Sequence, residues 1–170
     1  MTILTFPVEK RGAQRPAVQQ ETTIVRLTLT EAADWQRTIM VECRRQRVLT
    51  PSLPAFLKRA GLMDRCTFLS STGPGEPLVF RHLGVPTLSV LGRAWGRSVL
   101  NQPDEADPHV EFAHSIGAQY AESIGAGEAV FNRVTVSGVG RPFVYSHALY
   151  GWEDRGRRAI LSAVDIATVH

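Results

Sequence analysis

Three side chains that could do acid–base chemistry lie in segments whose apolar residues alternate as in β-strands, namely His82, His147 and Asp165. An imidazole and a carboxylate that share a cleft can act as a general acid–base pair. His147 and Asp165 would form such a pair in a small enzyme of a cone-shaped α+β type, provided that both face one side of a curved sheet. The other interpretation is structural, because sheet faces routinely carry half-buried histidines that hydrogen-bond a neighbour or a ligand.

The sequence contains no motif of a nucleophilic or nucleotide-binding site. It lacks G-x-S-x-G, H-E-x-x-H and G-x-x-x-x-G-K-[ST]. The glycine-bearing segment 92–96 follows no predicted strand and has no lysine, so it does not predict a phosphate-binding loop. The acidic segment 104–107 lacks the spacing of a calcium loop. We therefore expect no metal site and a protein that is not an enzyme.

Cys43 and Cys66 are the only two cysteines, and they form no CxxC pair. Thiols of this kind are most often buried small apolar side chains in a reducing compartment, although a disulfide between the two stays open.

Length and composition predict one globular domain, with 170 residues of which 44% are hydrophobic. No apolar run approaches the roughly 20 residues of a membrane helix, and the first residues do not have the pattern of a secretory signal, so we expect a cytoplasmic protein.

The net charge is +3, and Lys10, Arg11 and Arg15 lie in the predicted N-terminal arm. The remainder of the chain is nearly neutral, which does not favour nucleic-acid binding. Binding of nucleic acid through the basic residues of the arm stays an alternative.

Periodicity and turn residues place these side chains in a definite order of elements. Residues 1–22 are predicted to be a flexible arm, and residues 23–29 a short strand or an extended lead-in. The further elements are a lead-in helix (30–48), a shorter helix (52–61), a hairpin (65–70 and 77–83), short helical turns (84–100), a longer helix (107–124) and three strands (129–137, 143–150 and 157–167). We expect an α+β domain with a five-stranded antiparallel sheet and helices on one face.

This order, with several local motifs, resembles the PAS-domain family and most closely a bacterial subgroup of stand-alone PAS-like domains. The motifs are Asp34-Trp35 with Cys43-Arg44-x-x-Arg47 and Pro51, Phe80-Arg81-His82-Leu83-Gly84 with Leu91-Gly92 and Gly96-Arg97, Tyr120 with Gly127 and Val130, and Ala148-Leu149-Tyr150-Gly151 with residues 161–166. Tyr150-Gly151-Trp152 departs from the Pro-Leu that such domains often have. The resemblance implies a single PAS-like domain over residues 23–170, with its core at 52–167.

A sensory or regulatory function in signal transduction follows from this resemblance. Such modules bind a small molecule between the sheet and the helical middle, dock a signalling protein partner, or dimerise. The expected pocket residues are His82, Trp95, Phe112, Ile116, Tyr120, Tyr145 and His147. The lead-in helix has an apolar stripe that needs a cover, either its own sheet or a second chain. Trp35, Ile39 and Cys43 are the expected contacts of a homodimer.

Haem and a photoactive flavin are the cofactors that the family suggests first, and the residues favour neither. Haem sensors of the PAS type place a histidine on the long helix. In this sequence His114 lies off the apolar face of that helix, and His109 lies on its first turn. Flavin photochemistry needs a cysteine on a middle helix, whereas Cys66 is in a predicted strand and Cys43 precedes the domain core.

Overall fold

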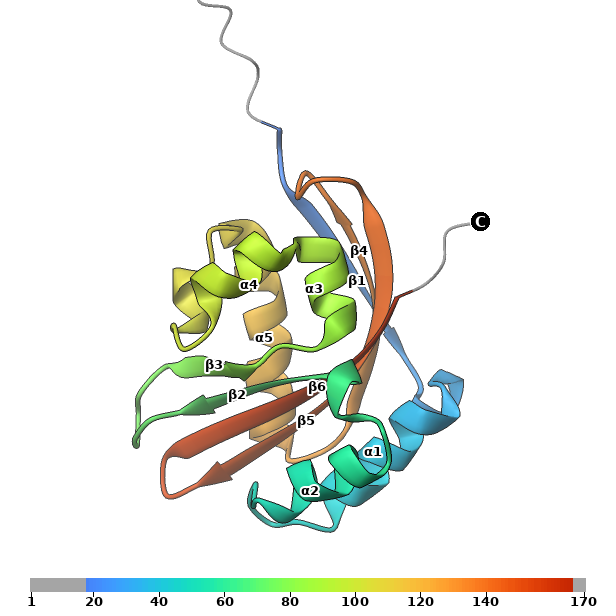
Figure 1. The fold of residues 1–170 in the computed structure, drawn as a ribbon, viewed down its shortest axis with the longest axis vertical. Helices are drawn as coiled ribbons and strands as arrows, with labels where there is room; N and C mark the ends of the chain where they lie inside the picture. Colours follow the sequence, from blue (N-terminus) through green and yellow to red (C-terminus); the bar gives the residue numbers. More distant parts are fainter. Residues whose placement is uncertain (1–17, 167–170) are drawn as a thin grey trace, which may run out of the picture.

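An antiparallel sheet of six strands forms the centre of the protein in the computed structural model, which describes residues 18–166 (Figure 1). The strand order is β1-β4-β5-β6-β2-β3. In sequence order the strands are β1 (Glu21–Leu27), β2 (Cys66–Ser71), β3 (Leu78–His82), β4 (Val130–Ser137), β5 (Phe143–Asp154) and β6 (Arg157–Ile166). The helices are α1 (Asp34–Arg44), α2 (Ser52–Arg59), α3 (Val85–Leu91), α4 (Arg93–Val99) and α5 (Val110–Ala126), with 3-10 turns η1 (Leu29–Glu31), η2 (Met63–Arg65) and η3 (Asp104–Ala106).

The predicted α+β class and antiparallel sheet are confirmed, but the sheet has one strand more than expected. The β2–β3 hairpin pairs through β2 with β6, so it lies beside the last three strands as predicted. The additional strand is β1, which pairs with the open edge of β4 from Glu21 to Leu27. An unpaired β4 would expose a row of backbone donors and acceptors, and β1 satisfies them. Residues 21 and 22 therefore belong to the sheet and not to an arm, while Lys10, Arg11 and Arg15 lie outside the described residues.

Helices cover both faces of the sheet, in contrast to the single covered face that the sequence predicts. Side chains of β5 alternate between two cores, so that Leu149 packs under α5 whereas Ala148 and Tyr150 pack on the opposite face under α1 and α2. Figure 1 shows α1 and α2 on one side of the sheet and α3, α4 and α5 on the other. Strands buried on both faces need this double cover.

The lead-in helix α1 takes its own sheet as its cover, which corrects the expectation of a dimer interface there. Ile39 and Cys43 are both 0% exposed within the core that α1 and α2 form with the sheet. Trp35 is half-buried, and the guanidinium of Arg65 lies 4.7 Å from its ring centre. Gln36, also fully buried, donates from Nε2 to the carbonyl of Ala163 at 2.9 Å and ties α1 to the sheet. Ile39 and Cys43 are thus not available to a second chain.

The boundaries of the remaining elements follow from local chemistry. The expected helical turns of residues 84–100 are α3 and α4, which meet at Gly92 with a φ of 91°, a backbone conformation that favours glycine. α5 ends at Gly127, also in the left-handed region, as a C-cap glycine predicts. None of the helices within residues 18–166 is both long enough and apolar enough to cross a membrane.

Close approach between α5 and β5 depends on a glycine in the strand. A Cβ added at Gly151 would lie 2.5 Å from the backbone of Ile124 in α5. We predict that Gly151→Ala lowers the free energy of unfolding by about 1–3 kcal/mol, because the helix must move away from the sheet. Gly125→Ala is the matched control in α5, since nothing lies within 4 Å of its added Cβ. It should be neutral or stabilise by up to about 1 kcal/mol. Urea unfolding of both variants tests this, and equal stabilities would contradict it.

Candidate functional site

A mainly apolar cavity of about 50 Å³ lies between the sheet and helices α3, α4 and α5. Six of the seven predicted pocket residues line it, namely Trp95, Phe112, Ile116, Tyr120, Tyr145 and His147. The rest of the lining consists of Thr67, Phe80, Thr87, Val90, Leu91, Asp104, Asp107, Ala113, Phe143, Ser162 and Val164. The space is enough for a few water molecules, since one water needs roughly 10–15 Å³.

His82 does not line this cavity, and the reason is a shift of strand register. Phe68 pairs with His82 while Leu69 pairs with Phe80, so Arg81 is an extra residue in β3. Such a bulge moves the next side chain to the other face of the sheet. The ring of His82 consequently lies edge-on to Phe68, which belongs to the core under α1 and α2.

Aromatic rings form the walls of the cavity. Trp95 of α4 meets Phe80 of β3 edge-on, with 5.9 Å between ring centres. On β5, the ring of Phe143 stacks on Tyr145 at 5.9 Å, and Tyr145 meets His147 edge-on at 5.5 Å. Since these residues are buried and mutually packed, the walls are well ordered on the sheet side.

Two phenols face the cavity without a hydrogen-bond partner among residues 18–166. Tyr120 and Tyr145 are buried, and burial raises the pKa of both phenols, so they remain neutral. The carboxylate of Asp107 accepts bonds from the indole N–H of Trp95 at 3.1 Å and from the backbone N–H of His109 at 2.9 Å. Burial also raises the pKa of Asp104, which lines the cavity at η3.

His147 is the most deeply buried polar residue of the cavity, with 1% exposure. It stands in register with Asn132 of β4, which stands in register with Arg26 of β1. We call these three residues the polar row. Asn132 Nδ2 lies 3.0 Å from His147 Nε2, and Arg26 Nε donates to Asn132 Oδ1 at 2.6 Å. Burial, and secondly the charge of Arg26, lowers the pKa of His147 to about 3, so the imidazole is neutral near pH 7.

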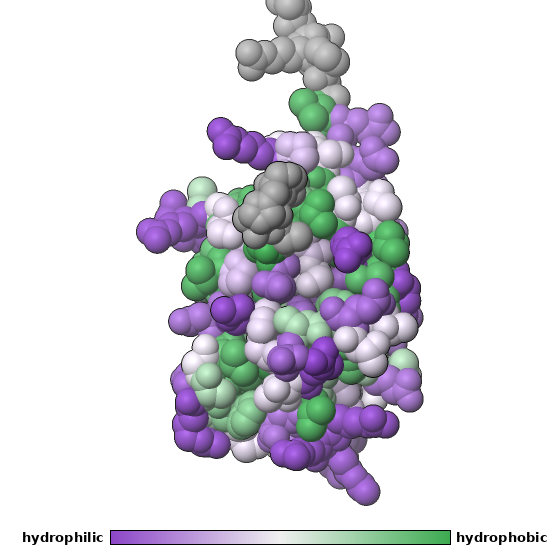
Figure 2. Space-filling view, turned by 90° about the vertical axis from the view of Figure 1, so that its right-hand side faces the viewer, coloured by the Kyte–Doolittle hydropathy of each residue, from purple (hydrophilic) through white to green (hydrophobic). Residues whose placement is uncertain are grey.

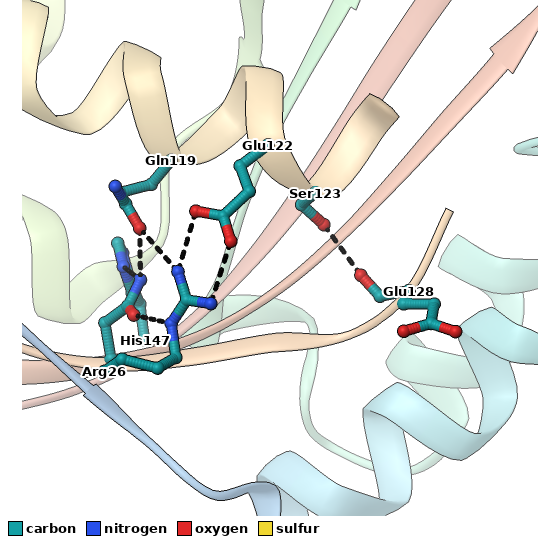
Figure 3. Close-up of polar contacts among 7 residues, drawn as sticks. Arg26, Gln119, Glu122, Ser123, Glu128 and His147 are labelled. Carbon is teal, nitrogen blue, oxygen red and sulfur yellow. Dashed lines mark hydrogen bonds and ion pairs between the residues drawn. The ribbon is translucent and has the colours of Figure 1, made fainter. Parts of the chain in front are cut away.

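The polar row reaches the surface at an ion pair with α5 (Figure 3). The guanidinium of Arg26 donates to both carboxylate oxygens of Glu122, at 2.8 and 2.7 Å. These two side chains are 48% and 45% exposed. The hydrogen bond from Arg26 lowers the pKa of Glu122. Gln119 Oε1, on the same helix, accepts from Arg26 at 3.1 Å and from Asn132 at 3.0 Å.

Sequence reasoning missed Arg26, Asn132, Gln119 and Glu122. One signal was present, because Asn132 interrupts the apolar face that Val130, Val134 and Val136 predict for its strand. A buried amide in such a face needs hydrogen-bond partners, and these come from distant parts of the chain.

The hypothetical acid–base pair does not form. His147 stands opposite Val164 in β6, whereas Asp165 stands opposite Ser146. Adjacent residues of a strand point to opposite faces, so Asp165 lies on the face covered by α1, and His147 on the cavity face. The predicted pairing of His147 with Asp165 as general acid and base is therefore wrong.

The other candidates for cofactor chemistry do not line the cavity. Neither His109 nor His114 lines it, and His114 is exposed on α5. Cys43 and Cys66 are free thiols in the core under α1 and α2, where burial raises the pKa of both, that of Cys66 to about 12. Across residues 18–166 no three His, Cys, Asp or Glu side chains are grouped so that they could hold a metal ion.

The depressed pKa of His147 predicts a specific loss of stability in acid. The imidazole of His147 takes up a proton near pH 6.5 in the unfolded chain, but only near pH 3 in the folded protein. The stability that depends on its neutral form is therefore fully present above pH 6.5, and it is lost as the pH falls from 6.5 toward 3. We expect the free energy of unfolding to decrease by up to about 1.4 kcal/mol per pH unit more steeply in the wild type than in His147→Gln. Urea denaturation at pH 7, 6 and 5 measures this. Identical slopes would show that His147 is not buried as a neutral group.

Comparison with known proteins gives no family for this chain. No family model matches the sequence, and no curated protein matches it. The site is therefore interpreted from its own geometry.

Proposed function

We propose that this protein is a PAS-like sensing module that binds a small molecule in the cavity between the sheet and helices α3, α4 and α5. The observation that carries the proposal is the cavity itself, which six of the seven predicted pocket residues line. It combines aromatic walls with buried polar side chains, Tyr120, Tyr145 and His147, that the described residues leave with unused hydrogen-bonding groups. Apolar pockets with a few convergent polar groups are the usual form of small-molecule sites.

The cover of the cavity supports the proposal because it can move at low cost. α3 contributes Thr87, Val90 and Leu91 to the lining, yet none of its residues is fully buried. Gly92 joins α3 to α4 with a backbone conformation that few other residues adopt. A ligand larger than a few waters would displace α3 and leave the sheet unchanged. This displacement is the kind of change that a sensor can transmit.

Docking of a signalling partner and formation of a homodimer stay part of the proposal, without Ile39 and Cys43. Exposed apolar residues include Val25 on β1, Val41 on α1, Val85 on α3 and Val110 on α5, and these lie on separate elements. On the face drawn in Figure 2, apolar side chains are scattered among polar ones. The mass of the protein in solution tests whether a homodimer forms.

A cavity-filling variant tests ligand binding directly. Ala113 of α5 lines the cavity, whereas Ala118 of the same helix is exposed and does not line it. We expect some members of a panel of small aromatic compounds to raise the melting temperature of the wild type and of Ala118→Leu, because binding stabilises the folded state. Ala113→Leu should abolish this shift. Thermal unfolding with and without each compound is the measurement. Equal shifts in Ala113→Leu, or no shift in the wild type, would contradict the proposal.

A further inference from the structure

We infer that the cavity selects a small, uncharged, largely apolar molecule that accepts a hydrogen bond from Nδ1–H of His147, such as an aryl ketone. This inference rests on the proposed function and names the chemical class of the ligand. It follows from the hydrogen bonds of the polar row, from the groups that line the cavity, and from the lack of a partner for His147 Nδ1 among residues 18–166.

Arg26 can only donate hydrogen bonds through its side chain. A guanidinium has only N–H donors and no acceptor. The side-chain atom of Asn132 that lies 2.6 Å from Arg26 Nε must therefore be the oxygen, Oδ1. The orientation of the Asn132 amide is thereby fixed, and its NH₂ group points away from Arg26.

Gln119 passes on the same constraint from Arg26, because its amide must also turn an oxygen toward the guanidinium. Its Oε1 accepts from Arg26 at 3.1 Å and from Asn132 Nδ2 at 3.0 Å. A reversed Asn132 amide would place two oxygens against each other at Gln119 and two donors against each other at Arg26. Both contacts would be repulsive, so the reversed state is excluded.

The consequence for His147 is a single tautomer. Asn132 Nδ2 donates to His147 Nε2 at 3.0 Å, so Nε2 must carry a lone pair and not a proton. A neutral imidazole then has its proton on Nδ1. His147 lines the cavity, and its remaining polar atom is a donor. Arg26 and Asn132 are thus positioning residues, which act on the ligand through His147.

The charges around the cavity exclude an anionic ligand. Asp104 and Asp107 are the acidic residues of the lining, and the lining contains no lysine or arginine. A carboxylate or phosphate would have no cation to pair with it there. An ammonium group placed against His147 would meet its Nδ1–H donor, so a cation cannot use the hydrogen bond that His147 offers. An uncharged acceptor on an apolar body fits both constraints.

Four probes of nearly equal size and two surface variants test the inference. The probes are acetophenone, α-methylstyrene, in which CH₂ replaces the carbonyl oxygen, benzoate and benzylamine. We expect the wild type to bind acetophenone about tenfold more tightly than α-methylstyrene, as one neutral hydrogen bond allows, and to bind the two ions weakest. Titration calorimetry or ligand-observed NMR gives the affinities.

Arg26→Gln is the informative variant and Glu122→Gln its control. A glutamine side chain both donates and accepts, so Arg26→Gln allows Asn132 to reverse, and the preference for acetophenone should fall to about threefold or less. Glu122→Gln keeps the donor-only guanidinium and should keep the preference. Long-range ¹H–¹⁵N spectra without ligand provide a second readout. They should show His147 protonated at Nδ1 in the wild type and in Glu122→Gln, and both tautomers in Arg26→Gln.

The outcomes separate this inference from the proposed function. If none of the probes binds, the proposed function fails and the ligand class fails with it. If the probes bind, but α-methylstyrene has the same affinity as acetophenone or benzylamine has the highest affinity, the cavity is a binding site and the inference about the ligand class is wrong. A wild-type His147 protonated at Nε2 would overturn it whatever binds.

Discussion

The two central strands of the sheet have to bury both of their faces, and the rest of the structure depends on this requirement. β5 and β6 are the longest strands, and their middle residues are buried on either side. On the α1 and α2 side the facing residues include Ala148, Ala159 and Ala163, which let the helices approach closely. On the other side Gly151 admits α5 against β5. Two helical layers are therefore needed, and they are α1 with α2 on one face and α3, α4 and α5 on the other.

The two layers differ in how completely they pack. The layer of α1 and α2 buries Ile39, Cys43, Leu53 and Leu57 fully. The layer of α3 and α4 encloses the cavity, and α3 has no fully buried residue. Because packed interiors resist deformation, we expect a change in structure to affect the layer of α3 and α4 before the layer of α1 and α2. This asymmetry, and not the cavity alone, supports the proposed sensing function.

Local patterns were sufficient to predict most elements and six of the seventeen residues that line the cavity. Alternation along β5 placed Tyr145 and His147 on one face, and helical spacing placed Phe112, Ile116 and Tyr120 on one side of α5. The failures arose where pairing between distant segments decided the outcome. The bulge at Arg81 turned the side chain of His82 to the other face of the sheet, and β1 paired with the open edge of β4. The apolar stripe on α1 is a third such case, because its spacing is the same whether a sheet or a second chain covers it.

The polar row shows the same limit in the chemistry of the site. Arg26 and Asn132 are 106 positions apart, so no spacing rule connects them, and only their register across β1 and β4 brings them together. Once they are in contact, elementary hydrogen-bond chemistry determines the rest. The surface side chain, itself half-exposed, sets which nitrogen of a fully buried imidazole carries the proton.

This arrangement suits His147 to recognition and not to proton transfer. An efficient general base needs a free lone pair and a pKa near the working pH. The lone pair of His147 Nε2 is occupied by Asn132, and its pKa lies near 3 because the imidazole is buried. What remains is an N–H donor of fixed direction on a rigid strand. Such a donor costs nothing to order when a ligand binds, so it discriminates between molecules that accept a hydrogen bond and molecules of the same shape that do not.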